Sequence, residues 1–318
     1  MYRALRIWSG VSVISGWFLG AASLSYGQGA CQEARLTASD PGVFESFGFS
    51  VAVWGETALI GAEWDREIAT EAGAVYVFGP QGTSWVEMQK LLASDGASLN
   101  HFGHAVALDG DVALIGAGGH QHDDDSGTGS AYVFRHNGSS WVQGQELIAS
   151  DGAWQDGFGT SVSISGDVAV IGAVFDDDNG AQSGSAYVFR YDSKSKSWLE
   201  EQKLLASDGA GGDFFGTAVA IFGEVALVGA DGHDDGAEST GAVYVFRYDA
   251  QTSRWVEEQK LLASDGTELD RFGDSVSISG DVALIGARLD VSGSAYVFRY
   301  DADKGQWIEQ QKLVPSDG

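Results

Sequence analysis

The chain is a succession of short apolar runs separated by turns that contain glycine. In a representative stretch, residues 161–165 (Ser-Val-Ser-Ile-Ser) alternate between polar and apolar, which predicts a strand with one buried face. Residues 168–171 (Val-Ala-Val-Ile) are continuously apolar, which favours a fully buried strand. Between them lies Gly166-Asp167, and a leading glycine is typical of a type II′ turn. The two runs therefore predict a tight hairpin.

Two further strands are expected after this hairpin. Residues 186–191 are rich in β-branched and aromatic side chains, and residues 198–205 combine Trp and Leu with Glu200, Glu201 and Lys203. Those charges indicate a solvent-facing outer strand that resists pairing with other chains. Because no segment shows helical periodicity, we expect a unit of four antiparallel strands, which is the size of a propeller blade.

This unit recurs five times with steps of 55 to 57 residues. The pair Phe-Gly begins at Phe47, Phe102, Phe158, Phe215 and Phe272. The pair Gly-Ala begins 14 residues later, at Gly61, Gly116, Gly172, Gly229 and Gly286. A Tyr-Val-Phe triplet begins at Tyr76, Tyr132, Tyr187, Tyr244 and Tyr296, and a Trp follows each triplet. We expect repeats over residues 38–318, with units starting near residues 38, 93, 149, 206 and 263 and a sixth begun at 315.

These motifs resemble the FG-GAP repeat of integrin α-subunit propellers and of exported bacterial proteins. The resemblance implies an all-β propeller of four-stranded antiparallel blades, with five FG-GAP-like repeats in this chain, and a role in adhesion or ligand binding outside the cell. The family's calcium loop, an alternating Asp series between the first two strands, is replaced here by the Gly-acid turn. The family's proline after Gly-Ala is also missing, and those positions hold Glu63, Gly118, Val174, Asp231 and Arg288.

Both ends of the repeat region contain the same part of the repeat unit, the fourth strand. Residues 32–40 match the tail of a fourth strand, and residues 307–317 supply that strand again in full. Because a closed propeller commonly completes one blade with strands from both termini, the overlap predicts an excerpt of a larger ring with further repeats. The alternative is a closed ring of five blades in which the N-terminal segment pairs beside the last blade.

The N-terminus predicts export. Basic residues precede a largely apolar stretch, and cleavage after Gly27 defines a signal peptide over residues 1–27. Residues 28–37 are then expected to form a lead-in strand, and the protein is expected to be secreted or held at the cell surface. An uncleaved anchor is one alternative, and a lipid-modified N-terminus at Cys31 is another. Cys31 is the only cysteine of the chain, so no intrachain disulfide can form.

Charge narrows the choice of partner. The chain carries 18 Lys and Arg against 45 Asp and Glu, a formal net charge of −27. Such a surface repels phosphate backbones and anionic lipid, which argues against nucleic acid and membrane surfaces and leaves an extracellular protein or glycan as the expected partner. The acid also attracts cations, although it can equally serve solubility alone.

Acidic residues gather in the loop between the second and third strands, where hard oxygen ligands suit Ca²⁺. Contiguous acids in an extended chain point alternately to opposite sides, so only alternate members can share an ion. The predicted calcium ligands are Asp123, Asp125, Asp176, Asp178, Asp234 and Asp235. Solvated turn acids are the alternative.

Histidine is concentrated in the second unit. The sequence His120-Gln121-His122 places two imidazoles on one side of an extended segment beside an acidic run, which is a possible transition-metal spacing. Exposed loop histidines without a metal are the alternative.

Catalytic motifs are missing: the chain has no nucleophile elbow, no phosphate-binding glycine loop and no metalloprotease helix signature. We therefore expect a non-catalytic binding module for adhesion or recognition. One alternative is an extracellular polysaccharide-active enzyme, a glycosidase or lyase that uses carboxylates from different blades. The other is a spacer array within a larger surface protein.

Overall fold

A computed structural model describes residues 35–42, 45–119 and 127–316. These residues form five four-stranded antiparallel sheets, one for each repeat. No helix in the described part of the chain is long and apolar enough to cross a membrane. The strands are β1 (Val51–Trp54), β2 (Thr57–Ala62), β3 (Ala74–Gln81), β4 (Ser84–Leu91), β5 (Ala105–Asp109), β6 (Val112–Ala117), β7 (Ser130–His136), β8 (Trp141–Leu147), β9 (Phe158–Ser165), β10 (Val168–Ala173), β11 (Ser185–Asp192), β12 (Ser197–Leu204), β13 (Phe215–Phe222), β14 (Val225–Ala230), β15 (Ala242–Asp249), β16 (Arg254–Leu261), β17 (Phe272–Ser279), β18 (Val282–Ala287), β19 (Ser294–Asp301) and β20 (Gln306–Leu313).

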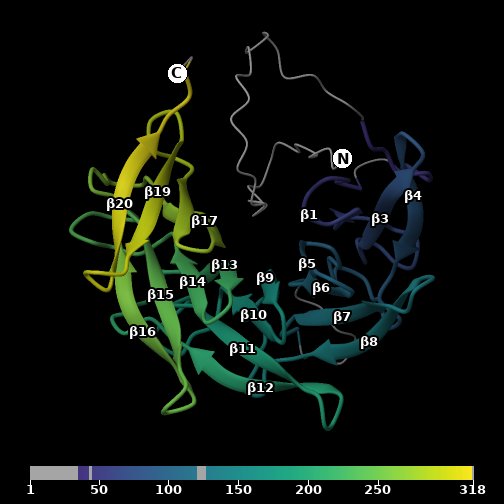
Figure 1. Ribbon diagram of the computed structural model, residues 1–318, viewed down its shortest axis with the longest axis horizontal. Helices are drawn as coiled ribbons and strands as arrows, with labels where there is room; N and C mark the ends of the chain where they lie inside the picture. Colours follow the sequence, from purple (N-terminus) through teal and green to yellow (C-terminus); the bar gives the residue numbers. More distant parts are fainter. Residues whose placement is uncertain (1–34, 43–44, 120–126, 317–318) are drawn as a thin grey trace.

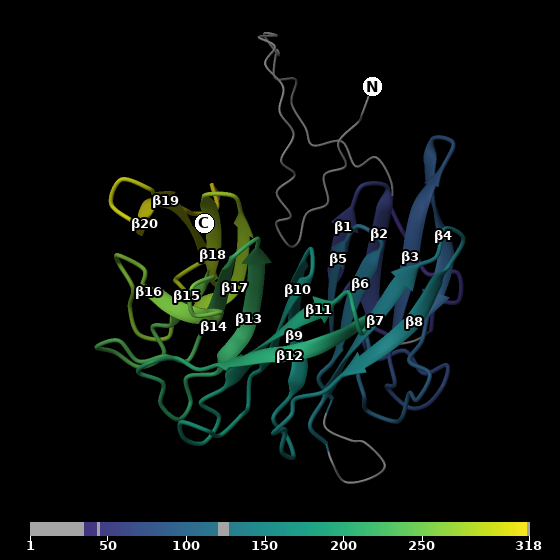
Figure 2. The same ribbon diagram turned by 60° about the horizontal axis from the view of Figure 1, so that its bottom comes forward.

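The sheets stand side by side around a common centre as propeller blades (Figures 1 and 2). In every sheet the strands follow chain order, with the first strand innermost and the fourth at the periphery. The predicted all-β propeller is therefore confirmed. The type II′ hairpin is confirmed as well, because Gly166 has a φ of 60° whereas Asp167 does not have a positive φ.

The Phe-Gly and Gly-Ala motifs meet between neighbouring sheets. A Cβ on Gly172, at the end of β10, would overlap the carbonyl oxygen of Gly216, at the start of β13 in the next sheet. Beside this contact, Phe215 N donates to Ser183 O at 2.9 Å. The same overlap occurs at Gly61, Gly116 and Gly229. Both glycines are thus required because two backbones pass within direct contact.

Aromatic side chains fill the space between the sheets. Phe158 is fully buried and makes an edge-on contact with Tyr187, with ring centroids 5.4 Å apart. It packs in one cluster with Leu114 and Val133 of the preceding sheet. Phe102, Phe215 and Phe272 are buried equivalently, as the recurrence of this position predicts.

The peripheral strands are joined by side chains. Gln202 in β12 donates to Trp255 O and accepts from Trp255 N in β16, both at 2.9 Å, so one amide bridges two sheets as a strand backbone would. The prediction that the charges of β12 face solvent is wrong in part. Glu200 accepts two hydrogen bonds from Ser150 of the preceding sheet, and Lys203 is largely buried in an ion cluster.

The first and fifth sheets do not share a core in the described part of the chain. Each of four hydrophobic clusters joins one pair of neighbouring sheets, and the fifth joins Leu36 and Ala38 to the first sheet alone. Leu313 in β20 is 40% exposed, whereas its equivalent Leu261 in β16 is 2% exposed. The arrangement is an open arc rather than a closed ring of five blades (Figure 1).

The lead-in strand predicted over residues 28–37 stays a prediction. Residues 35–37, the only part of it that is described, are not in a strand. The remainder of that segment, and the predicted signal peptide, lie outside the described residues.

Replacement of Phe158 by alanine tests the packing between sheets. We expect Phe158→Ala to lower the free energy of unfolding by about 3–5 kcal/mol, because a buried aromatic ring is lost and a cavity remains. Phe222, which is half exposed at the end of β13, provides the control, and Phe222→Ala should change stability little. Chemical denaturation of both variants measures the difference; equal losses would contradict the assigned burial.

Candidate functional site

The third repeat brings two predicted calcium ligands together on a lysine. The Lys203 ammonium lies 2.8 Å from Asp176 Oδ2 and 2.7 Å from Asp178 Oδ2. A third carboxylate, Asp151, lies in the connection between β8 and β9 and is 2.9 Å from the ammonium, and Tyr187 Oη donates to it at 2.8 Å. A built-in cation is therefore already paired with these carboxylates.

The same ion cluster recurs in four of the five repeats, on Lys90, Lys203, Lys260 and Lys312. Burial disfavours the Lys203 ammonium, but the hydrogen bonds that it donates to Asp176, Asp178 and Asp151 outweigh burial and raise its pKa. The hydrogen bond from Lys90 is the main cause that lowers the pKa of Asp40. In the last three clusters one carboxylate follows the fourth strand of the preceding sheet, so these clusters also tie neighbouring sheets together.

The fourth repeat has a histidine in its ion cluster. Its residue four positions after the Gly-Ala glycine is His233, which is buried and lies 3.0 Å from Asp213 and 3.2 Å from Lys260. Asp235 lies 3.9 Å from Lys260, whereas Asp234 accepts from Ser239 N in its own loop. Counted from the Gly-Ala glycine, His233 takes the position of Asp176, and Asp234 takes that of Asp177.

The remaining predicted ligands, Asp123, Asp125, His120 and His122, lie outside the described residues. Among the described residues, no group of three or more His, Cys, Asp and Glu side chains is placed to hold a metal ion. The calcium and transition-metal sites stay predictions.

A hollow of about 600 Å³ lies where the five second strands end. We call it the strand-end hollow. Its lining includes the residue after Gly-Ala from every repeat, namely Glu63, Gly118, Val174, Asp231 and Arg288. It also includes the residue after Phe-Gly from the last four repeats, namely His104, Thr160, Thr217 and Asp274. The motifs are the same in each repeat but these neighbours differ, so the hollow has a different chemistry on each side.

Charged pairs line two sides of the hollow. His104 Nδ1 lies 2.6 Å from the buried Glu63 carboxylate. Across the hollow, Arg271 donates to Asp231 at 3.0 Å, and Arg288 donates to Asp274 at 3.0 Å. Burial is the main cause that raises the pKa of Asp231, against the opposing charge of Arg271.

Aromatic side chains form the remaining wall. Trp64 is 40% exposed, and Phe175 contacts Phe214 edge-on with centroids 6.2 Å apart. The combination of apolar faces with a few placed polar groups is typical of small-molecule and sugar sites.

Local backbone strain directs several side chains toward this hollow. The residue before Phe-Gly has a φ of 55° at His101 and 56° at both Phe214 and Arg271, and all three side chains line the hollow. Non-glycine residues in this region are unfavourable by about 1 kcal/mol or more. The sequence alone does not show that these residues share one site. Its only indication is that the residues beside the Phe-Gly and Gly-Ala motifs differ from repeat to repeat.

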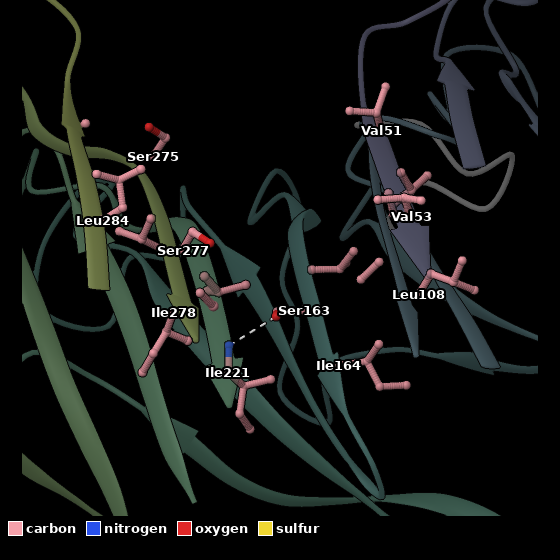
Figure 3. A pocket seen from close by; sticks show the side chains of 18 of the residues that line it. Val51, Val53, Leu108, Ser163, Ile164, Ile221, Ser275, Ser277, Ile278 and Leu284 are labelled. Carbon is pink, nitrogen blue, oxygen red and sulfur yellow. Dashed lines mark hydrogen bonds between the residues drawn. The ribbon is translucent and has the colours of Figure 1, made fainter. Parts of the chain in front are cut away.

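A second cavity, of about 430 Å³, lies along the inner strands of the arc (Figure 3). Aliphatic side chains such as Val53, Leu108 and Ile164 face it, together with Ser163, whose Oγ accepts from Ile221 N at 3.1 Å. The described residues that line it include no charged side chain. It therefore offers less chemistry for recognition than the strand-end hollow.

Comparison with known proteins agrees with this architecture. A family model described as FG-GAP repeat matches residues 31–78, 85–134, 141–189, 198–246 and 255–298. The last four matches begin at a fourth strand and end in the third strand of the next sheet, so the family's repeat unit spans two blades. No curated protein sequence matches the chain.

A crystal structure of a protein from Lactobacillus plantarum is similar in fold, with a TM-score of 0.53 and 14% sequence identity. The similarity covers 84% of this chain and 70% of that one.

Replacing the lysine of one ion cluster tests its contribution to stability. We expect Lys203→Met to lower the free energy of unfolding by about 2 kcal/mol, because Asp176 is left buried beside other carboxylates without a counter-charge. The matched control is Lys194→Met, since Lys194 is exposed in a turn of the same repeat. Urea denaturation measures both; a Lys203→Met protein as stable as the control would contradict this role.

Proposed function

This chain belongs to the FG-GAP repeat family, and from that membership we propose an exported, non-catalytic module that binds a glycan outside the cell through the strand-end hollow. The observation that carries the proposal is the lining of the hollow. Five repeats that share their motifs present different side chains there, from a Glu–His pair to two Asp–Arg pairs.

The chemistry of the hollow favours a sugar. The half-exposed Trp64 and the rings of Phe175 and Phe214 offer flat apolar faces for the C–H side of a pyranose. Arg288 carries donors beyond the one given to Asp274, and these suit the hydroxyl or carboxylate groups of a glycan. A protein loop that offers similar groups is the competing partner.

Export is part of the proposal. It is supported by the signal-like residues 1–27 and by the acidic surface of the chain. Mass spectrometry of the protein recovered from culture medium tests it, since cleavage after Gly27 defines one expected mass.

A second function is favoured by one observation. Glu63 and Asp231 are buried carboxylates of the same hollow, and the raised pKa of Asp231 is a property of general acids in glycosidases. Asp231 is however paired with Arg271 at 3.0 Å, and the charge of Arg271 opposes the rise in the pKa of Asp231. We therefore place binding before catalysis.

Glycan-array binding with hollow variants tests the proposal. We expect the exported protein to bind a defined set of glycans and Trp64→Ala to weaken binding at least tenfold, because a stacking face is lost. Trp154→Ala is the control, since Trp154 is 62% exposed and is not part of the lining.

Three outcomes contradict the proposal. Binding that is equally strong in Trp64→Ala places the ligand elsewhere, and retention of a protein instead of any glycan on pull-down assigns the competing partner. Turnover of a glycan that is abolished in Asp231→Asn assigns the enzyme.

A further inference from the structure

Two arginines of the fifth repeat stand together on one side of the strand-end hollow. Arg271 precedes β17 and Arg288 follows β18, and both line the hollow. The equivalent positions of the other four repeats hold no arginine. Both arginine charges act on Asp231, which places the two guanidinium groups near the same carboxylate. An acidic chain therefore has a cationic pair at one place in the hollow.

Each arginine is held by a carboxylate on one side only. Arg271 Nη1 donates to Asp231 Oδ2 and Arg288 Nε donates to Asp274 Oδ1, both at 3.0 Å. A guanidinium has five N–H donors, so each pair uses a small part of them. In the part of the chain that the structure describes, Arg271 Nε is shielded from solvent and has no hydrogen-bond partner. The Arg271 side chain is 33% exposed and that of Arg288 is 56% exposed, so a ligand can reach both.

The backbone fixes the direction of Arg271. Its φ of 56° lies in the left-handed region, which is unfavourable for a residue other than glycine. Arg271 N donates to Ser239 O at 3.2 Å, and the next residue, Phe272, is fully buried. Donors that are held in place before the ligand arrives lose little conformational freedom on binding.

A carboxylate is the group that these donors suit best. A guanidinium is planar and presents parallel N–H groups to the two oxygens of a carboxylate. Thr217 and Phe214 of the fourth repeat line the same hollow and offer a hydroxyl and an apolar ring. A pyranose that carries a carboxylate has a complementary group for each of them.

We propose that the strand-end hollow binds an acidic sugar, with the carboxylate of a uronic acid held by Arg271 and Arg288. The inference rests on the glycan-binding function proposed above and names the class of sugar that the hollow selects.

The net charge of the chain limits how acidic the glycan is. At −27 the chain repels polyanions. Repulsion between exposed charges is screened beyond about 10 Å at 0.1 M salt, whereas direct contact with an arginine is screened much less. One carboxylate in an otherwise neutral glycan gains the local contact and meets little of the repulsion. We therefore expect an isolated uronic acid rather than a polyuronate.

Paired oligosaccharides on a glycan array test the assignment. The members of a pair differ at one sugar only, glucose against glucuronic acid or galactose against galacturonic acid. We expect the acidic member of at least one pair to bind about tenfold more tightly than the neutral member, because a charge-assisted contact is gained. A sulfate ester on the same sugar carries a charge without the planar carboxylate, so it should gain less.

Substitution of Arg288 connects this preference to the hollow. Arg288→Gln should weaken binding of the acidic member about tenfold more than binding of the neutral member, and Arg288→Lys should do so by a smaller factor because it keeps the charge. Arg299→Gln is the matched control and should keep the preference of the parent. Arg299 makes a similarly exposed pair with Asp281 in the same repeat but does not line the hollow.

The outcomes separate this inference from the proposed function. Neutral members that bind as tightly as acidic ones, through Trp64, overturn the acidic sugar and leave the glycan-binding function standing. The absence of binding to any glycan overturns both. Equal weakening of both members in Arg288→Gln, loss of the preference in Arg299→Gln, or a stronger preference for the sulfated sugar overturns the carboxylate site. Tighter binding of an oligosaccharide made only of uronic acids at low ionic strength overturns the restriction to one carboxylate.

Discussion

The direct contact between the backbone of one sheet and the backbone of the next is the constraint on which the rest of the structure depends. At the end of β10, Gly172 lies against the carbonyl of Gly216, and no side chain fits between them. This contact sets the distance between the two sheets at the Phe215-Gly216 pair. Phe215 then enters the core between two sheets, where it meets Tyr244 edge-on. The Gly-Ala and Phe-Gly motifs therefore form the interface between neighbouring sheets. Each contact needs Gly-Ala from one sheet and Phe-Gly from the next, so a single repeat cannot form it.

Because the glycines and aromatic rings fix the geometry, the positions beside them are free to differ. The residue after each Gly-Ala leaves the sheet at the same point in every repeat, and those five points surround the strand-end hollow. Glu63 and Asp231 are thus placed by the same backbone although their partners, His104 and Arg271, differ. The ion clusters follow the same logic. One tyrosine position serves five repeats. Opposite it stands Lys203 in the third repeat and Glu146 in the second, so the cation of the cluster is replaced there by a carboxylate.

Much of this fold could be predicted from the sequence, because local pattern and global fold agree. The period-two alternation of residues 161–165 and the turn at Gly166 predicted the inner hairpin, and the recurrence of Phe158 predicted a core position. The charges of β12 were harder to interpret. Lys203 looks like a solvent-facing residue in isolation, and only the fold brings Asp151 to it from the connection between β8 and β9. The hollow could not be predicted because its residues are far apart in sequence and several depend on a left-handed backbone, as at Arg271.

The most direct test of this account compares alanine at two equivalent glycines. Gly172 faces the Gly216 carbonyl of the next sheet, whereas a Cβ on Gly286 meets only atoms of Ser275 in its own sheet. Gly172→Ala should lower the free energy of unfolding by about 3 kcal/mol, because the two backbones must separate. Gly286→Ala should lower it by about 1 kcal/mol or less, because a serine hydroxyl can rotate away. Denaturation of the two variants side by side measures the difference, and equal losses would contradict the claim that contact between the sheets is what requires the glycine.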